Sequence, residues 1–264
     1  GGLHNTAART YNLSGGAALT GDWGHAGASY RYYASDYGIP GGFVGSHGEG
    51  VGIDLERHTA RLDAERRIGL GPFTTLHATG TFTRYDHAER EHVHDDHDDH
   101  DDHDDHDHDD HDDHDHDEVG TSFGQDLAAA DLVARHGAFG PLTEGAIGVR
   151  GQWRDVTTGG SLRTPNTRDR TLAAFVVEEV AVGPVRLQGG LRYDWSRYVP
   201  QEASTVRVGD EEIPATARTF DAFSGSLGVL WPASSWLTVG GSVARAYRTP
   251  GFHQVYSDGP HLAA

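Results

Sequence analysis

Residues 185–196 read VRLQGGLRYDWS, and this stretch decides the fold. Its odd-numbered positions include Leu187, Leu191, Tyr193 and Trp195, whereas its even-numbered positions carry mostly polar side chains. Because successive side chains of a β-strand point to opposite faces, this alternation predicts a strand with one apolar and one polar face. A length of ~10 residues or more is that of a tilted strand that crosses a membrane.

Nine other segments alternate in a similar way. The ten predicted strands are 10–22, 26–33, 53–66, 73–85, 121–136, 142–154, 169–180, 185–196, 219–230 and 236–247. Turn signals separate them at intervals of 47, 69, 43 and 49 residues, at Gly24, Gly71, Gly140, Gly183 and Pro232. Removing the 24 residues 94–117 shortens the second interval to 45, so we interpret that segment as an insertion into a repeat of hairpins.

Short turns alternate with long connections at 34–51, 155–167 and 200–218. Long strands with short turns on one side and long loops on the other are typical of outer-membrane barrels. Aromatic residues near the long loops and near the short turns predict two girdles. The first group is Tyr30, Tyr32, Tyr33, Tyr193, Trp195, Tyr198 and Tyr247, and the second is Trp23, Phe73, Phe139, Trp231 and Trp236. The prediction is an all-β fold, an antiparallel transmembrane β-barrel segment of about ten strands.

Two soluble all-β folds compete with this interpretation. A β-propeller also repeats every ~40 residues, but each blade packs four short strands into that length. A soluble sandwich is favoured by the adjacent Glu178 and Glu179, which are awkward in a strand that faces lipid. The same two residues interrupt the most apolar window, so no spanning helix is expected.

The charge of the chain is concentrated in one place. The net charge is -19, but residues 95–118 contain 16 of the 40 acidic side chains and none of the 21 basic ones. A nucleic-acid partner is excluded, since phosphate binding needs a concentrated basic surface. The absence of Cys removes disulfide scaffolds and thiol catalysis, and the absence of Met predicts a fragment or a trimmed mature segment.

Segment 92–118 is almost purely His and Asp, and we expect it to bind metal. Its ten histidines are His92, His94, His97, His100, His103, His106, His108, His111, His114 and His116. Neutral imidazole is a good ligand for Zn²⁺, Cu²⁺ and Ni²⁺, and carboxylates supply further ligands. The Asp side chains repel one another, so the segment is expected to be disordered without metal. An inert polar spacer is the alternative, and calcium binding does not need ten imidazoles.

The repeat places this loop on the same side as 37–41 and 253–261, which is extracellular if the short turns face the periplasm. Four more residues in those long-loop regions are candidate ligands, each more ordinary as a polar loop residue: His47, Glu49, His253 and His261. His58 and His77 fall inside strands and are interpreted as lumen or surface residues. No catalytic residues are assigned, because no pattern brings Ser, His and Asp together as a triad.

Two motifs resemble a known family. Residues 35–41 (SDYGIPG) with the strand 52–55 (GIDL) are similar to an early barrel hairpin of TonB-dependent outer-membrane receptors of the zinc-uptake branch. Residues 244–250 (ARAYRTP) and 256–263 (YSDGPHLA) are similar to a mid-barrel strand and its following loop. Gln254 and Val255 depart from the Glu-Leu that the family more often has, which weakens a carboxylate ligand there.

The resemblance covers nearly the whole chain, 1–264, and implies about half of a barrel whose lumen is filled by a plug domain. It implies a non-enzymatic receptor in the outer membrane of a Gram-negative bacterium, contacting lipid and coupled to TonB through a plug that this chain lacks. Zinc or a similar divalent metal is then the transported ligand, with no other cofactor. The alternatives are a receptor for a siderophore or haem-type chelate and a surface protein that buffers metal.

Overall fold

The computed structural model describes residues 5–40, 50–92, 117–160, 164–208 and 211–256. Its main body is one antiparallel sheet of ten strands, in which each strand pairs with the next along the chain. The strands are β1 (Ala8–Gly21), β2 (Gly24–Pro40), β3 (Gly50–Leu70), β4 (Phe73–His92), β5 (Asp117–His136), β6 (Leu142–Gly160), β7 (Thr167–Val182), β8 (Val185–Pro200), β11 (Arg218–Pro232) and β12 (Thr238–Arg245). The predicted ten-stranded antiparallel fold is confirmed.

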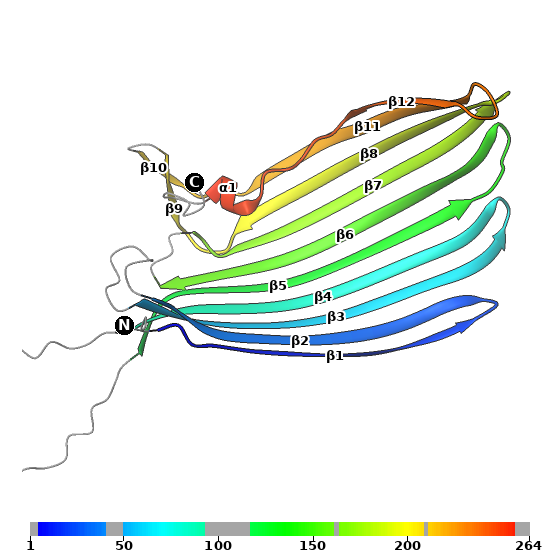
Figure 1. Ribbon diagram of the computed structural model, residues 1–264. Coiled ribbons are helices and arrows are strands. Elements are labelled where there is room, and N and C mark those ends of the chain that lie inside the picture. Colours follow the sequence, from blue (N-terminus) through cyan, green and yellow to red (C-terminus); the bar gives the residue numbers. More distant parts are fainter. Residues whose placement is uncertain (1–4, 41–49, 93–116, 161–163, 209–210, 257–264) are drawn as a thin grey trace, which may run out of the picture.

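Figure 1 shows the short turns at one end of the sheet and the long connections, with both termini, at the other. Most strands are longer than predicted; the third covers Gly50–Leu70 instead of 53–66. The long connections are correspondingly shorter, since residues up to Pro40 and from Gly50 belong to strands. The reason is that backbone pairing continues beyond the apolar band, where side-chain alternation no longer marks the strand.

Two small elements were not predicted, and both lie at the long-connection end. The first is a hairpin of β9 (Thr205–Val208) and β10 (Glu211–Pro214), which separates β8 from β11 in the chain. The second is the helix α1 (Phe252–Tyr256), which follows β12. No helix in the described ranges is long and apolar enough to cross a membrane.

The register of the strands separates an apolar face from a polar face across the whole sheet. One row runs from Leu132 through Val149 and Ala174 to Tyr193 and Phe223 on five successive strands. Val149 is 53% exposed and Phe223 is 67% exposed. Large apolar side chains that face outward over an entire sheet need a non-aqueous neighbour. The sheet therefore has the fold of a segment of a membrane-spanning barrel, with the other face towards the lumen.

Aromatic residues border this apolar face, with two corrections to the predicted girdles. Trp23, Phe139, Trp231 and Trp236 are exposed near the short turns. At the opposite end Tyr30, Tyr32, Tyr193 and Trp195 share the apolar face. The prediction was wrong for Tyr33 and Tyr198, which follow these residues at odd spacing and so lie on the polar face.

The two adjacent glutamates that argued against a membrane strand both have partners. On the apolar side, Glu178 Oε2 lies 2.9 Å from His136 Nε2, and the two side chains are 28% and 6% exposed. Gly145 lies between them in the register, and a Cβ there would collide with both. Glu179 lies on the polar side, where its carboxylate accepts a hydrogen bond from Thr143 Oγ1 at 3.2 Å. Paired carboxylates near a short turn are compatible with a barrel wall.

His136→Ala is expected to lower the free energy of unfolding by about 1.5–3 kcal/mol, because the Glu178 carboxylate loses its hydrogen-bonded partner. Urea unfolding of the complete protein in detergent measures this. Replacing both His136 and Glu178 by Ala should destabilise less than the two single changes added together. Strict additivity would contradict the pairing.

Candidate functional site

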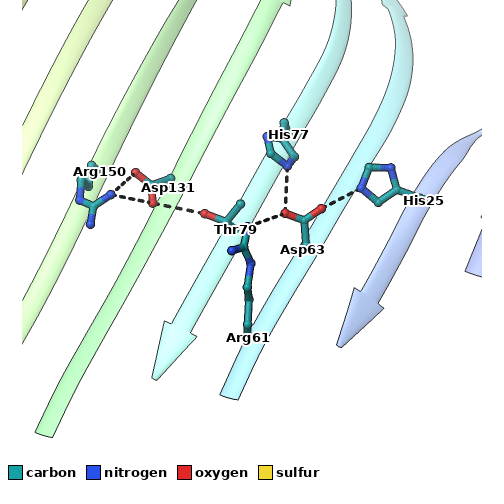
Figure 2. Close-up of polar contacts among 7 residues, drawn as sticks. All are labelled: His25, Arg61, Asp63, His77, Thr79, Asp131 and Arg150. Atoms are coloured by element: carbon teal, nitrogen blue, oxygen red, sulfur yellow. Dashed lines mark hydrogen bonds and ion pairs between the residues drawn. The ribbon is translucent and has the colours of Figure 1, made fainter. Parts of the chain in front are cut away.

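A band of charged and polar side chains crosses β2 to β6 on the polar face (Figure 2). Asp131 on β5 accepts a hydrogen bond from Thr79 Oγ1 at 3.2 Å. Arg150 Nη1 on β6 donates to both oxygens of the same carboxylate, at 3.1 and 3.2 Å. Asp131 is therefore paired with the Arg150 guanidinium through a bifurcated contact from one nitrogen, which makes it a poor metal ligand.

The other carboxylate in the band, Asp63 on β3, has two histidines as partners. His25 Nε2 on β2 lies 2.8 Å from Asp63 Oδ1, and His77 Nε2 on β4 lies 3.3 Å from Oδ2. One ligand atom from each of the three side chains lies within 4.8 Å of the other two. The side chains of His25, Asp63 and His77 are 38%, 32% and 28% exposed. Among the described residues, this is where His and carboxylate groups gather closely enough to hold a metal ion.

Strand register explains the geometry. His25 is the first residue after Gly24, whose φ of 129° closes the β1–β2 turn. His25 and His77 pair on either side of Glu65 of β3, and Asp63 is two residues away on the same face. The carboxylate of Glu65 lies 3.7 Å from Arg135 Nη1. Asp63 is therefore the carboxylate that both imidazoles contact, near the short-turn end.

A second feature of the polar face lies at the long-connection end. Phe252 and Tyr256 of α1 are buried against Val156 and Tyr198. The Tyr198 hydroxyl donates to the Pro250 carbonyl at 2.8 Å, and the Tyr256 hydroxyl donates to the Thr216 carbonyl at 2.8 Å. Burial raises the pKa of the Tyr256 phenol above its ordinary value, which keeps it a donor. The chain after β12 thus turns back onto the polar face at the barrel mouth.

Most of the candidate ligands inferred from sequence lie outside the described residues. These are His47, Glu49, His94, His97, His100, His103, His106, His108, His111, His114, His116 and His261. The backbone of His92 belongs to β4 and that of His253 to α1. His92, Asp117 and Glu118 are strand residues, since β4 and β5 remain paired as far as His92 and Asp117.

That pairing also fixes where the His/Asp segment 93–116 is attached. The flanking residues His92 and Asp117 lie opposite each other at the end of the β4–β5 hairpin, on the side of the long connections. His25 and Asp63 were missed by sequence reasoning, and His77 was assigned only to the lumen or surface. The available signal was the hairpin register, since 25, 63 and 77 share a face once Gly24 and Gly71 are taken as turns.

Comparisons with known proteins agree with the fold. A family model described as "TonB dependent receptor-like, beta-barrel" matches residues 2–264. No curated protein matches.

Two solved structures have similar folds. One is titled "Copper transporter OprC", with 11% identity and a TM-score of 0.62 over 95% of this chain and 39% of that one. The other is a double mutant of the Serratia marcescens hemophore receptor HasR in complex with its hemophore HasA and heme, with 12% identity and a TM-score of 0.65 over 97% of this chain and 38% of that one. The chain spans about two fifths of the length of these two proteins. With the family model matching 2–264, the chain belongs to the TonB-dependent receptor-like β-barrel family.

Proposed function

We propose that this chain is part of an outer-membrane receptor that captures zinc, or a similar divalent transition metal ion, and imports it into a Gram-negative cell. The observation that carries the proposal is the attachment of a His/Asp-rich segment to the β4–β5 hairpin at the long-connection end. In outer-membrane barrels the longer loops face the outside. The segment then meets metal ions before they reach the lumen.

Two properties of the segment suit it to capture. Ten imidazoles between His92 and His116 supply nitrogen ligands that suit zinc, copper and nickel. The surrounding carboxylates raise the local concentration of cations, an effect that weakens with increasing ionic strength. In this proposal, the imidazoles of the segment select transition-metal ions by coordination, and its carboxylates attract cations by charge.

The apolar face supports the membrane location, and family membership supports the energy source. We infer that lipid covers the exposed apolar side chains and that a plug domain outside this chain couples transport to TonB. The proposal is for a transporter without catalytic residues, in which the metal ion is cargo. A receptor for a haem-type or siderophore chelate and a surface metal buffer are the alternative outcomes of the tests.

Deleting residues 94–117 from the complete protein is expected to lower zinc uptake severalfold at limiting zinc. The barrel should still assemble, because the segment is inserted between paired strands. Uptake of radioactive zinc by cells, normalised to surface abundance, measures the effect.

A matched variant separates coordination from charge. Replacing the nine histidines from His94 to His116 by Asn keeps every carboxylate, so it should reduce uptake nearly as much as the deletion if imidazoles are the ligands. Full zinc uptake by both variants at limiting zinc would show that the segment acts only as a spacer.

A further inference from the structure

We propose that His25, Asp63 and His77 form a binding site for one divalent transition metal ion on the lumenal face of the barrel wall, near the short-turn end. The site is separate from the His/Asp segment, which is attached at the opposite end of the sheet. The proposed metal site can therefore be tested independently of metal capture by the His/Asp segment.

The donor set is suited to such an ion. Two imidazole nitrogens and one carboxylate oxygen are the ligands of many zinc sites, and imidazole favours transition metals over calcium and magnesium. Bonds of 2.0–2.1 Å in a tetrahedral arrangement separate neighbouring ligand atoms by ~3.3 Å. The observed contacts of 2.8 Å and 3.3 Å join the two imidazoles to different oxygens of Asp63, and one ligand atom from each side chain lies within 4.8 Å of the other two. Side-chain rotations that draw these atoms together would bring them to this spacing.

The strands hold these side chains in a fixed relation. Each residue comes from a different strand, and the three strands β2, β3 and β4 are continuously paired around the site. The centroids of the two imidazole rings are 6.4 Å apart and the rings are inclined at 54°. Because β2 and β4 flank β3, the two imidazoles approach Asp63 from its two neighbouring strands (Figure 2). A groove of about 350 Å³ opens beside Asp63 and is lined by Gly16, Gly27 and Arg61. An ion therefore reaches the carboxylate from the lumen.

The site favours temporary occupancy over permanent storage. Three protein ligands leave a coordination position open for water or for an exchanging ligand, unlike the closed four-ligand sites that stabilise folds. Each ligand side chain remains about one third exposed. Arg61 Nη2 lies 3.4 Å from Asp63 Oδ2 and competes with a bound cation for this carboxylate. These features suit an ion that passes along the wall.

Without a metal ion, the same three side chains would form a hydrogen-bonded cluster in which both histidines donate to Asp63. The experiment must therefore distinguish a metal site from a hydrogen-bonded cluster. His58 provides a matched control because it too is a strand histidine that contacts a carboxylate: its Nε2 lies 3.0 Å from Glu56 Oε1, and its Nδ1 lies 2.6 Å from the Tyr30 hydroxyl. It lies on the apolar face, in the row of Tyr32. Tyr30 and Glu56 supply no second imidazole, so this group of side chains lacks one of the nitrogen ligands of the proposed site.

The test uses the complete protein in detergent, with residues 94–117 deleted so that the His/Asp segment does not mask the site. Zinc calorimetry and the visible absorption of bound Co²⁺ report the occupancy. We expect one ion per chain at this site, and His25→Ala and His77→Ala should each weaken binding at least about tenfold. His58→Ala should leave binding unchanged. Equal zinc affinity of the protein lacking 94–117 and its three histidine variants would overturn the proposal. So would the absence of zinc binding by the protein lacking 94–117.

Arg61→Gln keeps the test decisive if a histidine variant fails to fold. Removing this cation is expected to strengthen zinc binding about two- to fivefold, in line with the strength of partly exposed ion pairs. A gain in affinity does not arise from misfolding. Unchanged or weaker binding by Arg61→Gln would contradict the site, while zinc uptake by the protein with an intact His/Asp segment would still test the proposed function separately.

Discussion

Leu191→Arg is expected to prevent assembly of the barrel in the outer membrane. Leu191 lies in the middle of the stretch 185–196, is 62% exposed, and belongs to the apolar face in a row with Val176. A charged side chain on the lipid face near the bilayer midplane destabilises a barrel by about 2–4 kcal/mol. Surface labelling of cells and the heat-dependent shift in gel mobility measure folded protein in the membrane.

Gln188→Arg is the matched control for this prediction. Gln188 lies on the same strand, three residues away, so its side chain points to the opposite face. It is exposed on the polar side, where a cation stays hydrated. This variant should assemble at the normal level. Equal assembly of both variants would show that the apolar face does not contact lipid.

Zinc binding by a peptide covering 92–117 is expected to fall at least about 100-fold between pH 7.5 and pH 5.5. Imidazole has an ordinary pKa of about 6.5, and metal and protons compete for the same nitrogen. Over this interval the neutral fraction of each imidazole falls about tenfold, and two or more imidazoles per ion multiply the effect. Binding is therefore present above the imidazole pKa and lost below it.

Calorimetric titration at the two pH values checks this. Carboxylates remain ionised at pH 5.5, so coordination by Asp alone would give similar affinities at both. Copper, zinc and nickel should bind well above calcium and magnesium. Equal zinc affinity at both pH values, or calcium binding as tightly as zinc, would show that the ten histidines are not the ligands.

The fold was largely predictable because a barrel strand displays its environment in its sequence. The alternation in 185–196 predicts one apolar and one polar face, and the structure places Leu187 and Leu191 on the exposed apolar face as expected. Glu178 and Glu179 argued against this fold when read alone. Their partners, His136 and Thr143, lie more than 30 residues away, so only the pairing of β5, β6 and β7 reveals them.

The candidate site on the lumenal wall was harder to predict for the same reason. Asp63 is 38 residues from His25 and 14 from His77, and no short motif joins them. The hairpin turns bring them together, and an error of one residue in register would place one of them on the other face. The helix α1 was missed because its five residues are held by contacts with Val156 and Tyr198, which local sequence does not show.

The central claim is that the complete protein imports a divalent transition metal ion. Its most direct test is the uptake of radioactive zinc, supplied as the free ion at limiting concentration, by cells that contain or lack the protein. We predict uptake that depends on the protein and stops when the proton gradient is dissipated, with no competition from haem or a ferric siderophore. Equal zinc uptake by both cell types, together with protein-dependent uptake of haem or a siderophore, would contradict the account.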